Sequence, residues 1–146
     1  MNWQPYNLDQ KAQRLVLNYR DKEGVIGQSH KMRATVSYGL ERFWGEHLRL
    51  LGKNDAKERE KGKYWQSTWK EFVNIMKVTG IQLPSEEIRE NETDKIEKIA
   101  EKLWSLPLED QKICLAVLTQ FCDCLVWWTQ RYKKASDRDD NQTIGN

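Results

Sequence analysis

The sequence predicts an all-α fold: a single antiparallel helical bundle of about five helices with a disordered C-terminal tail. Pro and Gly are sparse, at 3 and 8 of 146 residues, which favours long helices over strands and turns. The longest apolar run, from Ile113 to Tyr132, lies in an otherwise polar chain, and apolar residues elsewhere recur at three- and four-residue steps. A chain of this length can bury a core as one domain.

Residues 1–28 are expected to form a lead-in with one short helix over residues 8–19. A second helix is predicted from residue 29 to residue 51, with Ser29 as its N-cap and Gly52 just beyond its end. Its off-stripe positions include several cations. The apolar stripe consists of Met32, Val36, Leu40, Phe43, Trp44, Leu48 and Leu51.

A third helix is predicted over residues 56–79, capped by Asp55 and ended by Gly80. Its first half, KEREKGK, is nearly all charged and is expected to project from the core. Gly62 is expected to weaken the helix at this point by roughly 1 kcal/mol relative to Ala. The second half is expected to pack into the core through Tyr64, Trp65, Trp69, Phe72, Val73, Ile75 and Met76.

A fourth helix is predicted from Thr93 or Asp94 to a break at Ser105–Pro107, and a fifth from residue 108 to residue 135. The fifth helix is apolar on more than one side, which is typical of a helix that others cover. Its internal Gln and Asp residues favour a buried soluble helix over a membrane span. One face is predicted to hold Ile113, Ala116, Val117, Gln120, Phe121, Cys124, Leu125, Trp128 and Tyr132.

The helical core is therefore expected over residues 29–135, and residues 136–146 are polar enough to predict a disordered tail. Charge divides the chain differently. Residues 1–83 contain 15 Lys and Arg against 9 Asp and Glu, whereas residues 84–146 contain 9 against 13. This asymmetry indicates either a half that faces a polyanion or simply solvated helix faces.

No constellation for catalysis or for a cofactor is present. His30 and His47 are 17 positions apart and have no fixed relation to the cysteines, so no metal site is expected. The glycines match no phosphate-binding loop, and no nucleophile motif occurs. The three cysteines, without a signal peptide, indicate reduced thiols in the cytoplasm. The spacing of Cys122 and Cys124 favours small buried side chains over a redox pair.

A basic, aromatic-interleaved segment remains. From Lys31 to Lys77 there are 11 Lys and Arg against six Asp and Glu, and flexible cations in rows suit the phosphates of a nucleic acid. A second cluster, Arg131 to Lys134, either complements the helix dipole or contacts the same ligand. Trp65, Trp69, Trp127 and Trp128 are either core residues or platforms for bases. Because Trp127 and Trp128 are adjacent, one of them is expected at a surface.

The segments HKMRATVSYGLERFWGEHLRLLGK and LVWWTQRYKKA, within residues 29–135, resemble the small subunit of class 1 CRISPR effector complexes. The subtype I-D form is the most similar, type III small subunits are similar as well, and so is the helical C-terminal domain of the large subunit. The resemblance lies in architecture and in the basic middle of the chain, and no catalytic motif is involved. It implies a cytoplasmic, non-catalytic subunit that uses neither a cofactor nor a membrane.

The resemblance also implies partners. These are target DNA or RNA with the guide RNA, the other subunits of the effector complex, and further copies of the chain in a filament. An alternative is a helical protein-interaction adaptor that does not bind nucleic acid. On this resemblance, the positions expected to contact nucleic acid are Lys31, Arg33, Arg42, Arg49, Lys53, Lys57, Arg59, Lys61, Lys63, Arg131, Lys133 and Lys134.

Overall fold

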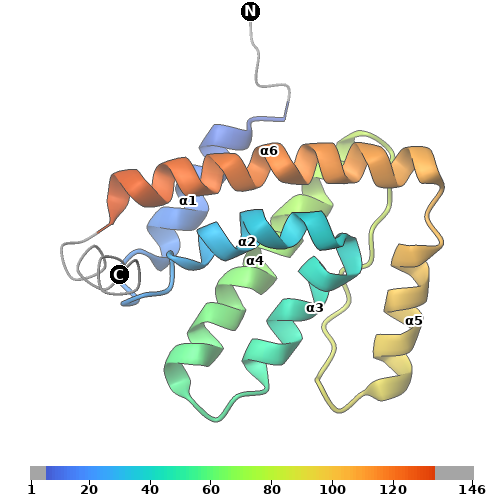
Figure 1. Ribbon diagram of the computed structural model, residues 1–146, viewed down its shortest axis with the longest axis horizontal. Helices are drawn as coiled ribbons and strands as arrows, with labels where there is room; N and C mark the ends of the chain where they lie inside the picture. Colours follow the sequence, from blue (N-terminus) through green and yellow to red (C-terminus); the bar gives the residue numbers. More distant parts are fainter. Residues whose placement is uncertain (1–5, 134–146) are drawn as a thin grey trace, which may run out of the picture.

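The computed structural model describes residues 6–133, and within them every regular element is helical (Figure 1), which confirms the all-α bundle. The tail predicted over residues 136–146 lies outside the described residues. The elements are α1 (Leu8–Tyr19), α2 (Gln28–Thr35), a 3₁₀ turn η1 (Val36–Tyr38), α3 (Leu40–Leu51), α4 (Ala56–Val78), α5 (Thr93–Trp104) and α6 (Leu108–Tyr132).

Helix α6 lies across one end of the molecule and packs on α1 and α2, while α3 and α4 form a hairpin that extends away from it (Figure 1). Helix α5 flanks α3. The Arg20 Nε at the end of α1 donates to the Tyr132 carbonyl at the end of α6 (2.8 Å). One core cluster runs from Leu8 to Leu125, so residues 8–28 belong to the bundle and are not a separate lead-in.

The helix predicted over residues 29–51 is in fact two helices, α2 and α3, separated by η1 and Gly39. Gly39 adopts φ 97° and ψ 173°, a conformation that is open essentially to glycine alone. The expected apolar stripe nevertheless stays in register, because Met32, Val36 and Leu40 are all buried. The break changes the helix direction without moving the stripe away from the core.

Ser29 is not an N-cap. It lies within α2 and is fully buried, and its Oγ is 2.6 Å from the Tyr64 hydroxyl and 2.7 Å from the Thr129 Oγ1. Burial raises the pKa of Tyr64 well above its ordinary value of 10.0, so the phenol stays neutral. Among the described residues, no buried side-chain nitrogen or oxygen lacks a partner. This polar junction joins α2, α4 and α6.

The ends of α4 are formed as predicted. The Asp55 carboxylate accepts a hydrogen bond from the Lys57 backbone N–H (2.8 Å), which is N-capping. At the other end Gly80 has φ 86°, the Gly80 N–H bonds to the Lys77 carbonyl (3.0 Å), and the Ile81 N–H bonds to the Met76 carbonyl (3.1 Å). This pair of bonds is a Schellman motif, which requires a left-handed residue.

Contrary to the prediction, the first half of α4 does not project freely from the core, because Gly62 is buried against α3. A Cβ on Gly62 would lie 2.9 Å from the Leu51 backbone nitrogen and 3.0 Å from the Leu50 Cβ. Gly62 therefore permits a close approach of two helices. At the start of α5 the N-cap is Glu92, not Thr93 or Asp94, and α5 ends before Ser105–Pro107 as expected.

Helix α6 is buried on a face rotated from the predicted one. The inward residues are Cys114, Val117, Leu118, Phe121, Cys122, Leu125 and Thr129. Ile113, Ala116 and Gln120, predicted on that face, are exposed. By length and mean hydropathy (1.3) α6 meets the criteria for a membrane span. A core helix of a soluble protein meets the same criteria, and α6 packs on α1 and α2.

His47 in α3 is a buried titratable group with a direct effect on stability. It is 4% exposed, and its Nδ1 donates to the Trp44 carbonyl. Burial lowers the pKa of His47 below its ordinary value of 6.5, against the effect of the Trp44 bond, and the nearby Lys70 lowers the pKa further. The folded protein therefore holds His47 neutral at pH values where the unfolded chain protonates it.

The free energy of unfolding is expected to be constant above about pH 7 and to fall as the pH drops below 6.5, the His47 value in the unfolded chain. One proton limits the slope to about 1.4 kcal/mol per pH unit. Urea denaturation from pH 8 to pH 5 measures this pH dependence, and His47→Gln should flatten the curve.

The pKa of the exposed His30 is also lowered, so His30→Gln is the control. A slope lost in His30→Gln and kept in His47→Gln would contradict the assignment.

Candidate nucleic-acid interface

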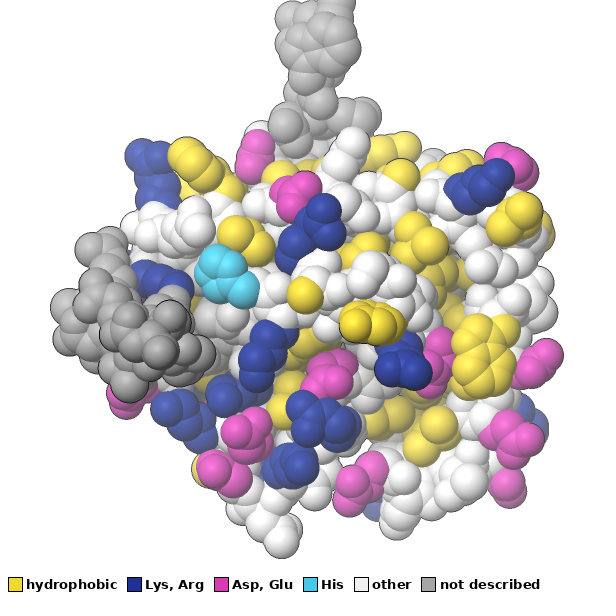
Figure 2. All heavy atoms as spheres, viewed as in Figure 1, with side chains coloured by type: hydrophobic (Ala, Val, Ile, Leu, Met, Phe, Trp, Pro, Cys, Tyr) yellow, Lys and Arg dark blue, Asp and Glu magenta, His cyan; other side chains and the backbone are white. Residues whose placement is uncertain are grey.

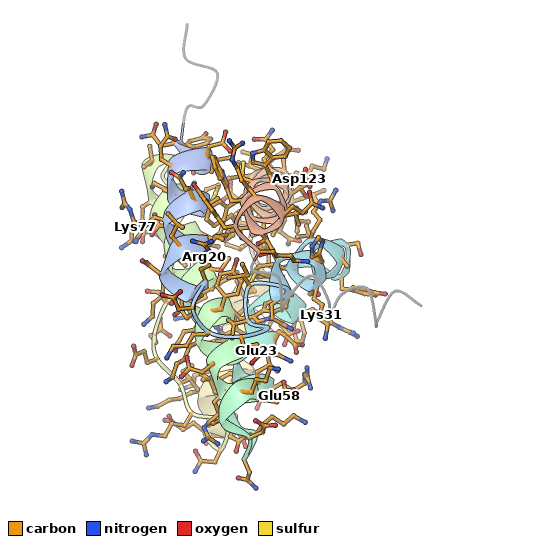
Figure 3. The ribbon with its side chains drawn as sticks, turned by 90° about the vertical axis from the view of Figure 1, so that its left-hand side faces the viewer. Arg20, Glu23, Lys31, Glu58, Lys77 and Asp123 are labelled. Atoms are coloured by element: carbon orange, nitrogen blue, oxygen red, sulfur yellow. The ribbon has the colours of Figure 1, made fainter. Side chains whose placement is uncertain are left out.

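The predicted cations come from α2, α3, the loop that follows α3, the first half of α4, and the end of α6 with the residues after it. In Figure 2, Lys and Arg side chains gather on the visible face over α2, α3 and α4, with acidic side chains among them. Lys134 lies outside the described residues. In Figure 3, the acidic residues Glu23 and Glu58 are seen in the same part of the view as Lys31, so acidic and basic side chains are mixed on this side as well.

Packing brings three of these regions together. The Ser29–Thr129 bond fixes the start of α2 against the end of α6. Burial lowers the pKa of His30, and the charge of Lys133 lowers it further, so Lys133 lies within electrostatic range of the start of α2. A Cβ on Gly24 would lie 3.0 Å from the Lys57 Cε, so Lys57 lies on the turn before α2. The structure thus joins the C-terminal cluster to the cations of α2 and α4.

Several predicted cations have a partner within the fold, in most cases a carboxylate. Arg33 on α2 pairs with Asp123 on α6 (2.7 Å), and the Arg59 guanidinium donates to the Lys53 carbonyl (2.9 Å). The hydrogen bond that Arg49 donates to the Glu46 carboxylate raises the pKa of Arg49. Three pairs within helices follow an i, i+3 spacing: Glu46–Arg49, Glu58–Lys61 (3.4 Å) and Glu60–Lys63 (3.1 Å).

These pairs make the surface less positive than its sequence suggests, but they do not prevent the cations from changing partners. Surface ion pairs contribute only about 0–1 kcal/mol each. Arg49 and Lys63 are more than half exposed in their side chains, at 58% and 55%. If Arg49 or Lys63 exchanged its carboxylate partner for a phosphate, the loss of the ion pair would therefore cost little free energy.

Five predicted cations are exposed and form no ion pair within residues 6–133. One of them, Arg131, lies at the end of α6 over the Trp128 ring. The other four are Lys31, Arg42, Lys53 and Lys57, and we call them the unpaired quartet. The Arg42 guanidinium instead lies over the Tyr38 ring, 5.6 Å from its centroid. Tyr38 was missed by the sequence reasoning, although its position before Gly39 and off the apolar stripe was a usable signal.

The tryptophans divide between the two alternatives. Trp65 and Trp69 are buried, at 1% and 3% exposed, and are core residues. Trp128 stacks on Tyr132, lies beneath Arg131 (5.8 Å) and donates to Asp9 (3.1 Å). Trp127 is 55% exposed, which confirms that one of the adjacent pair lies at a surface.

The thiols of this fold are held in their protonated form by burial. Cys114 and Cys122 are buried as predicted, and Cys124 is half-buried. Burial raises the pKa of Cys114 to about 11 and, with Asp9, that of Cys124 to about 12. Within residues 6–133, no group of three or more His, Cys, Asp or Glu side chains is placed to hold a metal ion.

Comparisons with known proteins add no assignment to this geometry. No family model, no curated protein and no solved structure matches the chain.

Proposed function

We propose that this protein is a non-catalytic small subunit of a CRISPR RNA-guided surveillance complex. In this role it contacts target or displaced-strand nucleic acid through the phosphate backbone and braces the assembly together with guide RNA, larger subunits and further copies of itself. The observation that carries the nucleic-acid contact is the unpaired quartet on α2, the start of α3 and the α3–α4 corner. Exposed cations without carboxylate partners are available for phosphates without the loss of an ion pair. The complex itself rests on the resemblance in architecture.

A second candidate is a protein-interaction adaptor that does not bind nucleic acid. It is favoured by a different observation, at the other end of the chain. Trp104 and Leu108, which flank the turn between α5 and α6, are 64% and 65% exposed. Exposed large apolar side chains of this kind are typical of protein contacts. An adaptor would use this region and leave the unpaired quartet in solvent.

Titration of the purified chain with labelled DNA and RNA strands over a range of KCl concentrations, followed by fluorescence anisotropy, separates the two candidates. We expect binding with little sequence preference and a log–log salt slope of about −3, because four phosphate contacts each contribute about −0.7 on a single strand. Absence of binding at the lowest salt, with the protein in large excess, would favour the adaptor. Purification from the native cell then asks whether guide RNA and larger subunits accompany the chain.

A further inference from the structure

Tyr38 occupies an unusual place in the fold. It ends η1 directly before the Gly39 corner, and it is 69% exposed. The backbone around it is ordered: the Gly39 N–H bonds to the Val36 carbonyl (3.0 Å), and the Ser37 hydroxyl donates to the Ala34 carbonyl (3.0 Å). The turn therefore presents an aromatic ring to solvent on a fixed support.

The ring has a cationic neighbour. The Arg42 guanidinium in the first turn of α3 lies over it at 5.6 Å from the centroid. A cation–π contact at an exposed site is attractive, and a planar guanidinium also stacks on flat groups. Because Arg42 has no ion pair within residues 6–133, its charge is available to an anion beside the ring.

A second cation lies on the same side of the chain. Lys31 and Thr35 are four residues apart on α2, the Thr35 hydroxyl donates to the Lys31 carbonyl (2.7 Å), and Tyr38 follows three residues later. Steps of four and three place side chains on one helical face. Seven residues of helix separate Lys31 from Tyr38 by roughly 10 Å. The order along the chain is therefore cation, exposed ring, cation.

We propose that Tyr38 is a base-stacking platform of the interface, with Lys31 and Arg42 holding the phosphates on either side, so that this surface selects single-stranded over duplex nucleic acid. The inference rests on the proposed nucleic-acid contact and adds a class of ligand to it. Bases of a single strand can turn a flat face to an aromatic side chain, whereas both faces of a base within a duplex are covered by its neighbours. Phosphate contacts alone give no such preference.

The test compares Tyr38→Ala and Tyr38→Phe with the unchanged protein on three probes: a labelled oligothymidine strand, the same strand with abasic sites, and a duplex of equal length. Stacking on one base is worth roughly a 5- to 100-fold change in affinity. We expect Tyr38→Ala to lose that factor on oligothymidine, to lose nothing on the abasic strand or the duplex, and Tyr38→Phe to bind normally. Trp104→Ala, an exposed aromatic 64% in solvent on α5, is the matched control and should bind normally.

Two outcomes overturn the inference while leaving the proposed contact standing. They are salt-sensitive binding that Tyr38→Ala does not weaken, and equal weakening on oligothymidine and on the abasic strand. If the unchanged protein binds none of the probes, the proposed contact itself is wrong and the inference falls with it. Tyr38 is 69% exposed, so the variant is expected to fold, and an unchanged urea midpoint checks that it does.

Discussion

Gly62→Val is expected to lower the free energy of unfolding by about 3 kcal/mol, because overpacking a close helix contact costs 1–3 kcal/mol or more. A Cβ at Gly62 would already be 2.9 Å from the Leu51 backbone nitrogen and 3.0 Å from the Leu50 Cβ. Neither atom is the far end of a flexible side chain, so α3 and α4 must separate. Urea denaturation followed by tryptophan fluorescence measures the loss, and the melting temperature should fall by about 6–12 °C.

Gly45 supplies the matched control in the neighbouring helix. A Cβ there would meet only the Glu41 Oε1, at 3.7 Å, which is ordinary contact. Gly45→Ala should therefore stabilise the protein by about 0.5–1 kcal/mol through helix propensity, whereas Gly62→Ala should destabilise it. Stabilisation by both alanines would mean that α3 and α4 do not approach closely at Gly62.

The sequence predicted where helical structure lies and most of the buried apolar side chains. This was possible because the apolar spacing continues even where the backbone does not continue as one helix. Met32, Val36 and Leu40 keep helical steps across η1, so periodicity alone cannot detect the break. The only sign in the sequence that the helix breaks at position 39 is the glycine itself. Ser29 shows the converse: its type suits an N-cap, but a partner on α4 and another on α6 hold it in the core.

The orientation of α6 could not be predicted for a related reason. Its apolar residues surround much of the helix, so two faces are about equally apolar, and only the positions of α1 and α2 select between them. The candidate interface shows the same division. The three i, i+3 pairs of α3 and α4 follow from sequence spacing, but the Arg33–Asp123 pair joins residues 90 positions apart and depends on how α2 lies on α6.

Replacement of the unpaired quartet by glutamine is expected to reduce affinity for single strands by roughly 10²- to 10³-fold at 0.1 M salt, and to make the salt slope shallower by about 3. Both numbers follow from the loss of four phosphate contacts. The four side chains are exposed, so the free energy of unfolding should change by less than about 0.5 kcal/mol per site. Anisotropy titrations over a range of salt concentrations give affinity and slope together.

A charge-matched variant decides whether position or net charge matters. Glutamine at Lys95, Lys98, Lys102 and Lys112, all exposed on α5 and α6, also removes four positive charges from a formal net charge of +2. Screening limits the range of a charge's electrostatic effect to about 10 Å at 0.1 M salt. This variant should therefore keep the affinity and the salt slope of the unchanged protein. Equal losses in the two variants would mean that the chain attracts nucleic acid only through its overall charge. A loss of affinity confined to the quartet variant would locate the contact on α2, the start of α3 and the α3–α4 corner. The cations there have no carboxylate partner and are therefore available for phosphates.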